Sequence, residues 1–471
     1  MIQSSFRPIS LHERFSLMRR NAGQPPILVV AASYPSKSAP TRIFLHQRIR
    51  ELQSHFPMLC SKIEGRKTTT PRQVLRERPW NATQVLREGT FHDFQDSIHE
   101  LERVLYQDGQ RMTGEDFEDC PLWQVTIYKN PSKDRVYISL AADHVIVDGR
   151  GLQLLFDALL AENISDLPYE RLEDVPRTED TINIKPSLTF ALPLIWQHLI
   201  LPFFPKFLQS YLSPISPWPS TLVSKSPIEC PPAFSLCSVP INQVSALKHI
   251  AIQHDVPTFH PVIKSIYSLA IWSKYRYTLS PFRLTASTPR SERDPKLGHA
   301  YCTSNYTSSH KLDISFTPAE DFWTVSKKVS DFLVDPANIS YAQMRMGILS
   351  YVPDGELSHV DPLRPTKWED FFLNQAVSDK PFDEALNFSN LGYTKLPQGV
   401  QDMGWTQWAS GICQAPLCTT IIGHERGLRL GTVWRDGAAV TEKEVKDIEK
   451  LFKNIVGKLI QGKTTIEDLL S

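Results

Sequence analysis

Apolar and polar positions in the first part of the chain alternate between a helical period and a strand period. Residues 10–20 have the start and spacing of a capped helix, residues 27–32 form the apolar run of a buried strand, and residues 42–55 are amphipathic. The Phe-Pro-Met-Leu run at 56–59 ends this helix, and the polar segment 65–89 indicates loop or edge structure. This alternation predicts an α/β (α+β layered) domain.

Two further β-rich runs, at 123–128 and 135–142, are separated by a segment with the composition of a hairpin turn. The second run leads directly into Asp143 and His144. The segment 152–160 that follows has the apolar spacing of a helix packed on a sheet. The first half of the molecule is predicted to close there.

The rest of the chain has the same α/β texture. A strand-like segment lies at 234–240, and helical segments lie at 244–254, 261–272 and 442–460. The connection before them is rich in proline, with three prolines between residues 214 and 219, which is typical of a linker. We therefore predict an N-terminal half over 1–164, a crossover over 165–232 and a C-terminal half over 233–471.

One part of the crossover, residues 188–207 (LTFALPLIWQHLILPFFPKF), is nearly long enough to span a bilayer. It is interrupted by Pro193, Pro202 and Pro205 and carries Gln197 and His198, so a spanning helix is not expected. Two alternatives remain. The segment is either a peripheral membrane-surface element that delivers an apolar substrate, or a helix that covers the junction between the halves.

Composition narrows the class of partner. Of 471 residues, 41% are hydrophobic, and 51 Lys and Arg balance 51 Asp and Glu, which gives a formal net charge of zero. Since no overall field favours a polyanion, no nucleic-acid partner is expected, and an uncharged or self-neutralised substrate fits better. The length is sufficient for two large half-domains, and we expect a monomer.

Cysteine usage and the N-terminus favour a cytoplasmic protein, with a peripheral position on an intracellular membrane as the alternative that 188–207 allows. The seven cysteines contain no CxxC pair and indicate reduced, mostly buried thiols. The first 15 residues lack the apolar region and cleavage site of a signal peptide. We therefore discount the five Asn-X-Ser/Thr sequons, at Asn81, Asn163, Asn305, Asn338 and Asn387.

The strongest candidate for chemistry is the His144-Val145-Ile146-Val147-Asp148-Gly149 motif, at the end of a predicted strand. A histidine that emerges from a sheet into a cleft can act as a neutral base at cellular pH. Asp148 is predicted to be architectural, pairing with a buried arginine or accepting backbone N–H bonds. Gly149 would permit a backbone conformation or close packing that a side chain would obstruct. Taken alone, such a His and Asp are also compatible with a purely structural pair.

The HVIVDG motif, the ISLHER opening at 9–14, the FPML run at 56–59 and the NFSNLG segment at 387–392 together resemble the HxxxD acyltransferases, particularly fungal alcohol acetyltransferase-like proteins. The resemblance covers about residues 9–455 and is weakest in the crossover. It implies two chloramphenicol-acetyltransferase-like half-domains, also seen in condensation domains, with a tunnel between them for acyl-CoA and an acceptor. It also implies that His144 deprotonates the acceptor, which attacks the thioester directly.

Further residue roles follow from this resemblance. Attack on a thioester creates an oxyanion, for which Ser389 and Asn390 are candidate donors; the alternative is that both stabilise a turn or cap. Arg290, after a predicted strand, is the expected partner of Asp148. Arg293 and Lys296 are candidates for contact with CoA phosphates on the basis of charge alone.

The segment Asp402-Met403-Gly404-Trp405 partly matches the DFGWG element of plant acyltransferases, with Met in place of Phe and Thr406 in place of the last Gly. We predict a structural strand or turn in which Trp405 and Trp408 pack in the core or line the acceptor tunnel. No cluster has metal-ligand spacing, and no Gly-x-Ser-x-Gly elbow is present.

The predicted function is therefore acyl-CoA-dependent transfer of an acetyl or other short acyl group to a small-molecule alcohol, with His144 as general base. Acyl-CoA would be a co-substrate, and no permanently bound cofactor or metal is expected. Two alternatives remain: an N-acyltransferase acting on a hydrophobic amine, and a noncatalytic ligand-binding or assembly protein that keeps the fold.

Overall fold

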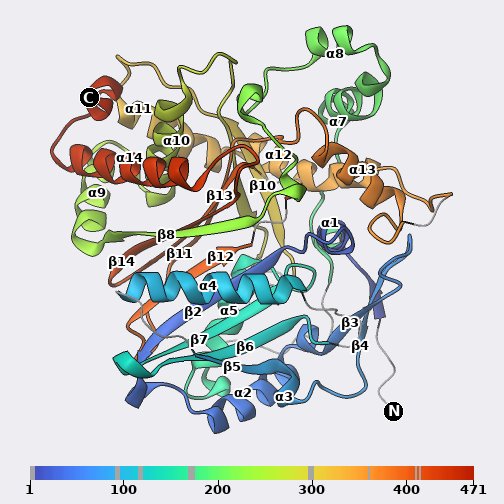
Figure 1. Cartoon of the computed structure of the whole chain (residues 1–471), viewed down its shortest axis with the longest axis vertical. Helices are drawn as coiled ribbons and strands as arrows, with labels where there is room; N and C mark the ends of the chain where they lie inside the picture. Colours follow the sequence, from blue (N-terminus) through green and yellow to red (C-terminus); the bar gives the residue numbers. More distant parts are fainter. Residues whose placement is uncertain are drawn as a thin grey trace.

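Two lobes lie one above the other along the long axis of the molecule (Figure 1). The computed structural model describes residues 6–90, 96–114, 120–167, 176–294, 302–358, 361–408, 411–412 and 415–471. Within these ranges the strands form a five-stranded sheet in the first lobe, a six-stranded sheet in the second and a small three-stranded sheet. The predicted α/β layered, two-lobed class is confirmed.

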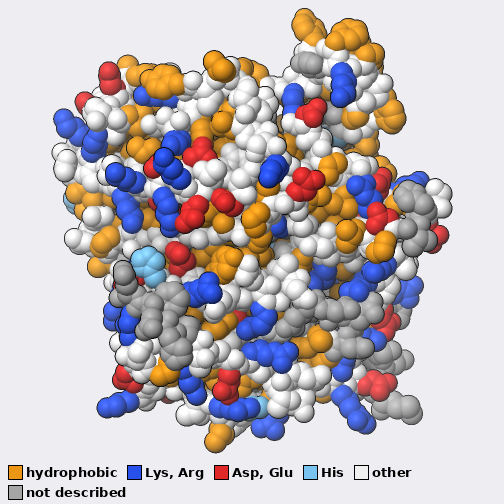
Figure 2. Space-filling view, viewed as in Figure 1, with side chains coloured by type: hydrophobic (Ala, Val, Ile, Leu, Met, Phe, Trp, Pro, Cys, Tyr) orange, Lys and Arg blue, Asp and Glu red, His pale blue; other side chains and the backbone are white. Residues whose placement is uncertain are grey.

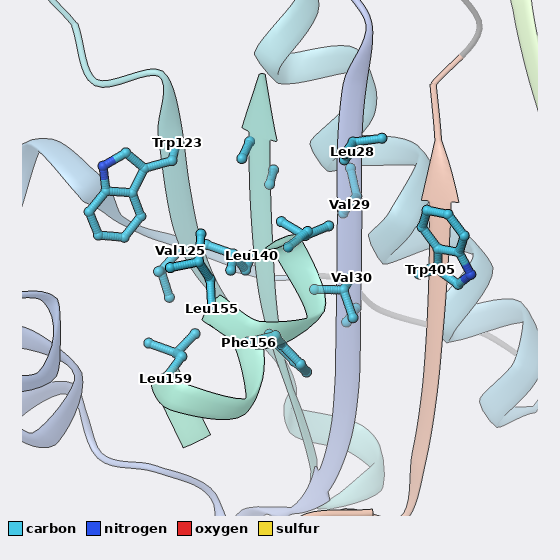
Figure 3. Close-up of a cluster of buried hydrophobic side chains, with 14 of the residues drawn as sticks. Leu28, Val29, Val30, Trp123, Val125, Leu140, Leu155, Phe156, Leu159 and Trp405 are labelled. Atoms are coloured by element: carbon cyan, nitrogen blue, oxygen red, sulfur yellow. The ribbon is translucent and has the colours of Figure 1, made fainter. Parts of the chain in front are cut away.

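The sheet of the first lobe has the order β12-β2-β7-β6-β5, in which only β5 and β6 run parallel. Its strands are β2 (Ile27–Pro35), β5 (Leu86–Thr90), β6 (Trp123–Asn130), β7 (Arg135–Asp143) and β12 (Asp402–Gln407). The helices around it are α2 (Arg42–His55), α3 (Ala82–Val85), α4 (Ser97–Gly114) and α5 (Gly149–Leu160). Figure 3 shows Leu155, Phe156 and Leu159 of α5 directed at the sheet, where they form the core with Val125 and Leu140.

The predicted hairpin before the HVIVDG motif is confirmed as the antiparallel pair β6 and β7. The side chain of Asn130 caps the connecting turn, and Asp134 adopts a left-handed backbone conformation with φ of 48°. Every residue of β7 except the first is buried, because the strand lies inside the sheet. The hairpin therefore delivers His144 from a rigid central strand.

The sheet of the second lobe has the order β10-β9-β11-β13-β14-β8. Its strands are β8 (Pro232–Pro240), β9 (Thr285–Ser291), β10 (Thr307–Asp313), β11 (Leu386–Tyr393), β13 (Leu417–His424) and β14 (Gly427–Arg435). The helices of this lobe are α9 (Ile241–Gln253), α10 (Phe259–Tyr275), α11 (Phe322–Val334), α12 (Pro336–Gly347), α13 (Lys367–Ala376), α14 (Glu442–Ile460) and α15 (Ile466–Leu470). One face of the sheet packs on α9, α10 and α14, and the other face contributes Phe234 and Val433 to the core of the first lobe.

The N-terminal segment and the region 65–89 form the edge of the first lobe. Strands β1 (Phe6–Pro8), β3 (Ser61–Glu64) and β4 (Arg72–Leu75) make the small sheet. Helix α1 (Leu11–Asn21) begins with a capping box in which Ser10 and Glu13 cap each other's backbone. The predictions of a capped helix at 10–20 and of edge structure within 65–89 are confirmed.

Strand β12 corrects the predicted division of the chain. It lies within the predicted C-terminal half, 233–471, but pairs antiparallel with β2 and becomes the edge strand of the first sheet. Trp405 of β12 is buried beside Val30 (Figure 3), and Trp408 is buried as well. Both tryptophans therefore pack in the core. Strand β12 connects the two lobes, and the local periodicity of the sequence does not reveal this crossing.

The crossover continues from α6 (Thr178–Thr181) to α7 (Leu188–Ile195), a π-helical turn at Trp196–Ile200 and α8 (Lys206–Leu212). Pro193 lies inside α7 and does not end it, whereas Pro202 and Pro205 separate the π-helical turn from α8. Figure 1 shows α7 and α8 projecting at the outer end of the second lobe, in green, away from the junction. The alternative that this segment covers the junction between the halves is therefore wrong.

Among the described residues, no helix combines the length and the apolar character that a membrane crossing requires.

Candidate active site

His144 is held immediately after the last residue of β7. Its backbone N–H donates to the carbonyl of Pro26 at 2.9 Å. The neighbouring Asp143 is fully buried, pairs with Arg20 and accepts a hydrogen bond from the backbone N–H of Val145 at 2.7 Å. Because backbone and side-chain contacts on both sides fix the chain here, the position of the imidazole is determined before any ligand binds.

Asp148 makes both kinds of contact predicted for it, with an arginine and with backbone N–H groups. Its carboxylate is fully buried, caps α5 by accepting from the Gly151 N–H at 2.7 Å, and accepts from the Tyr306 N–H at 2.9 Å. Arg293 forms a bidentate pair with it, through Nη1 at 2.8 Å and Nη2 at 2.7 Å. The loop 144–148 of the first lobe is thereby clamped to the second lobe.

The arginine that pairs with Asp148 differs from the one predicted. Arg290 lies within β9, opposite Ser308 of β10, and donates to Glu292 at 2.5 Å. Arg293 lies beyond the end of β9, where the chain leaves the sheet. Two arginines three residues apart have equal charge, and only the strand end decides which of them reaches the other lobe.

This pairing also corrects the role predicted for Arg293 in binding CoA phosphates. Its side chain is only 5% exposed and also donates to the carbonyls of Cys302 and Ser304, at 2.7 and 2.8 Å. A guanidinium whose donors are taken by protein acceptors is not available to a phosphate. Lys296, the other predicted phosphate contact, lies outside the described residues.

Asn305 decides which nitrogen of His144 carries the proton. The amide nitrogen of Asn305 donates to the backbone carbonyls of His144 at 2.8 Å and Val145 at 3.3 Å, so its Oδ1 faces the imidazole. Oδ1 lies 2.9 Å from Nδ1 of His144 and can only accept, so the neutral ring carries its proton on Nδ1. Nε2 then has a free lone pair, and among the described residues no group hydrogen-bonds to it. The ring has the tautomer of a general base.

The surroundings of His144 also keep it neutral. The residue is 7% exposed, and burial, followed by the positive charge of Arg19, lowers its pKa below the ordinary value of 6.5. The ring of His12 lies 4.8 Å from the ring of His144, centroid to centroid. Burial, His144 and Arg19 hold the pKa of His12 well below its usual range. Two neutral imidazoles therefore lie side by side.

The two predicted oxyanion donors lie on opposite faces of β11. Asn390 donates toward Nδ1 of His260 on α10 at 3.3 Å, and its Oδ1 accepts from the Gly392 N–H at 2.7 Å. Because side chains alternate along a strand, Ser389 points the other way. It pairs in register with Thr420, whose hydroxyl donates to the carbonyl of Trp405 in the first sheet. Ser389 thus faces the first lobe, and the prediction for Asn390 is corrected to a structural contact.

The residue Ser389 is 9% exposed, and its hydroxyl has no hydrogen-bond partner among the described residues. Leu391, on the same face of β11, packs on the core of the first lobe and lies 3.3 Å from the position that a Cβ on Gly149 would take. The face that carries Ser389 therefore adjoins the first turn of α5. The free hydroxyl of Ser389 therefore belongs to the second lobe, whereas His144 belongs to the first.

Gly149 is required for close packing and not for backbone conformation. A Cβ there would meet the Trp405 ring at 3.2 Å, and no positive φ is present. Gly151, two residues later, is more constrained, because a Cβ there would lie 2.0 Å from the backbone oxygen of Thr303. The first turn of α5 is therefore pressed against the segment that carries Asn305.

Sequence reasoning missed Asn305, His12 and Gly151 as parts of the site. Asn305 was visible only as part of a sequon, and His12 only as part of the ISLHER opening. Asn305 is 161 residues from His144, so no local spacing could indicate their contact.

Comparison with known proteins identifies the fold of the chain. No protein-family model matches the chain, and no curated protein matches it. The condensation domain of the Monacolin K polyketide synthase MokA is similar, with a TM-score of 0.66, 10% identity and 97% of this chain and 98% of that chain covered. The chain has the fold of condensation domains.

Two other similar structures are named for different activities, epimerization and cyclization. The epimerization domain of tyrocidine synthetase B, TycB3(E), has a TM-score of 0.60 and 13% identity, with 97% of this chain and 98% of that chain covered. The EpoB NRPS cyclization-docking bidomain from Sorangium cellulosum has a TM-score of 0.62 and 16% identity, with 97% and 85% covered. Since one fold hosts several activities, the reaction must be argued from the site. The tunnel between the lobes stays a prediction.

Proposed function

We propose that the protein is an acyltransferase that moves an acetyl or other short acyl group from acyl-CoA to an alcohol. The observation that carries this proposal is the tautomer of His144. Oδ1 of Asn305 accepts a hydrogen bond from Nδ1–H, which leaves the lone pair on Nε2 unpaired. Burial and the charge of Arg19 lower the pKa of His144, so the neutral ring offers this lone pair as a base.

In the proposed reaction, Nε2 of His144 removes the hydroxyl proton of the acceptor while its oxygen attacks the thioester carbonyl carbon. The tetrahedral intermediate carries an oxyanion, toward which the hydroxyl of Ser389 donates a hydrogen bond. The intermediate collapses by breaking the C–S bond. The thiolate of CoA leaves and takes the proton from Nε2, which yields an ester, CoA-SH and the neutral imidazole.

His144, Asn305 and Asp148 have distinct tasks in this scheme. His144 moves the proton, and Asn305 holds Nδ1–H so that Nε2 remains the base. Asp148 does not touch the reacting atoms. It fixes the loop through the Gly151 N–H, the Tyr306 N–H and Arg293.

A second candidate is N-acylation of an amine, and the likeness to the first condensation domain of the CDA synthetase and to the EpoB NRPS cyclization-docking bidomain favours it. The same base serves both acceptors, because an ammonium or hydroxyl proton can be taken by Nε2 once the acceptor lies in reach. In this case the acyl donor would be a thioester on a carrier protein or on CoA.

The test is thiol release from acetyl-CoA and from longer acyl-CoAs, with panels of small alcohols and hydrophobic amines, followed by product mass. We expect acceptor-dependent release and an ester product. An amide product would replace the first proposal with the second. Absence of product from any donor and acceptor, while ligands still bind and shift the melting temperature, would favour a noncatalytic binding protein.

A further inference from the structure

An arm formed by residues 188–215 carries a stripe of exposed apolar side chains. They are spaced about four residues apart, at Leu188, Leu192, Trp196, Ile200, Phe203, Phe207, Tyr211 and Ile215. Within the continuous helical stretch 188–200 this spacing keeps the side chains on one side, and α8, beyond Pro202 and Pro205, presents Phe207 and Tyr211 to solvent. Figure 2 shows hydrophobic side chains gathered on the projecting arm at the upper right. A contiguous apolar patch of this kind is typical of an interaction surface, whereas single exposed apolar residues are ordinary.

The opposite side of the arm is anchored to the second lobe. Ala191 is buried, and the ring of Phe190 stacks on Tyr341 of α12 with centroids 5.8 Å apart. Just before the arm, the carbonyl of Ile184 lies so close to Gly347 that a Cβ there would be 1.8 Å away. The exposed stripe therefore belongs to an element with a fixed inner face.

The charge of this region is one-sided. No Asp or Glu occurs between Asp180 and Glu229, although the whole chain has 51 acidic residues among 471. The same stretch contains Lys185, Lys206 and Lys225, all three of them exposed. An apolar stripe on a segment in which every Asp, Glu, Lys or Arg position is a lysine complements an anionic surface that has an apolar interior.

We propose that the arm binds the surface of a membrane that contains anionic lipids. Phe203 and Phe207 enter the boundary between headgroups and acyl chains, Trp196 and Tyr211 lie at headgroup level, and the lysines face lipid phosphates and carboxylates. A second copy of the chain fits the same surface less well, because it would bring the lysines of both arms together. This inference does not depend on the proposed acyl transfer.

The test is flotation of the full chain with vesicles of phosphatidylcholine, with and without about one-third phosphatidylserine. We expect binding to the mixed vesicles at least about ten-fold tighter than to phosphatidylcholine alone, since each lysine near the surface contributes about five-fold. The triple variant Phe203→Ser, Phe207→Ser and Tyr211→Ser should lose at least about ten-fold in binding to mixed vesicles.

A matched control removes equally exposed apolar side chains elsewhere. Ile43, Tyr277 and Leu279 are between 82% and 97% exposed, and the three residues changed on the arm are between 72% and 88% exposed. The triple serine variant of these control positions should bind vesicles as the unchanged protein does. Both variants should melt within a few degrees of the unchanged protein, because the substituted side chains contribute little to the core.

Charge is tested separately with Lys185→Glu, Lys206→Glu and Lys225→Glu. This variant should lose its preference for phosphatidylserine and retain the weaker binding to phosphatidylcholine. Equal loss in the arm variant and the control variant would overturn the proposal, as would the same binding to both kinds of vesicle. Concentration-dependent dimerisation that the arm variant abolishes, without vesicle binding, would assign the arm to a second copy.

Discussion

At the scale of single residues, the site depends on hydrogen bonds whose direction is fixed by groups that can only donate or only accept. The carbonyls of His144 and Val145 orient the amide of Asn305, and Asn305 in turn orients the proton of His144. The tautomer of the imidazole is therefore set by backbone oxygens of its own loop.

Replacing His144 with alanine is expected to lower the rate of acyl transfer by about 10² to 10⁴, the usual effect of removing a positioned base. The measurement is thiol release with the best donor and acceptor. His12→Ala is the matched control, because His12 lies beside His144 and takes no proton in the scheme. Its rate should fall much less. A His144→Ala variant with near-normal turnover would remove this residue from the mechanism.

The pH dependence of the rate tests the tautomer. A base acts in its neutral form, and the lowered pKa of His144 keeps it neutral to below the ordinary value of 6.5. Activity is therefore expected to be complete at neutral pH and to be lost as pH falls through a midpoint below 6.5.

Asn305→Asp should move this midpoint upward, because a carboxylate beside Nδ1 stabilises the imidazolium and raises the pKa of His144. The measurement is kcat/KM against pH for both proteins. If Asn305 had only a structural role, Asn305→Asp would lower kcat/KM at every pH and leave the midpoint of the pH profile unchanged. Melting temperatures show how much stability the lost bonds to the carbonyls of His144 and Val145 cost.

At the scale of elements, the sequence predicted helix bounds that depend on interactions between residues close together in the chain. Helices α2 and α14 have the bounds predicted, 42–55 and 442–460, because Thr41 and Thr441 cap their first turns. The choice of Arg293 over Arg290, and of Ser389 over Asn390, depends on where a strand ends and which face it turns to a partner. These facts arise only when the sheet is assembled, so the sequence alone could not supply them.

The first turn of α5 supports the HVIVDG loop. Its two glycines, Gly149 and Gly151, differ in how much space a Cβ would have. Gly151→Ala is expected to lower the free energy of unfolding by about 1–3 kcal/mol, because its Cβ would lie 2.0 Å from the backbone oxygen of Thr303. Gly149→Ala should cost less, since its Cβ meets only side-chain atoms, at 3.2–3.3 Å. Denaturant unfolding of both variants checks the order. An equal cost would contradict the account of the Thr303 contact.

At the scale of the whole molecule, β12 connects the two lobes. Its strand pairs with β2 in the first sheet, and the Nε1–H of Trp405 donates to the carbonyl of Ile421 in β13 of the second sheet at 2.7 Å. Glu102 of α4 also accepts from the Leu236 N–H of β8 at 2.7 Å. The boundary predicted at 233 is crossed by contacts in both directions.

Calorimetry is therefore expected to give a single unfolding transition for the two lobes. Trp405→Ala should lower its midpoint and leave it single, with a loss of about 3–5 kcal/mol, because the side chain is fully buried between the sheets. Tyr277→Ala, at an exposed aromatic, is the control and should leave the midpoint nearly unchanged. If the lobes were independent, Trp405→Ala would divide the transition in two, with one half unaffected. That outcome would also uncouple the lobe that carries His144 from the lobe that carries Ser389.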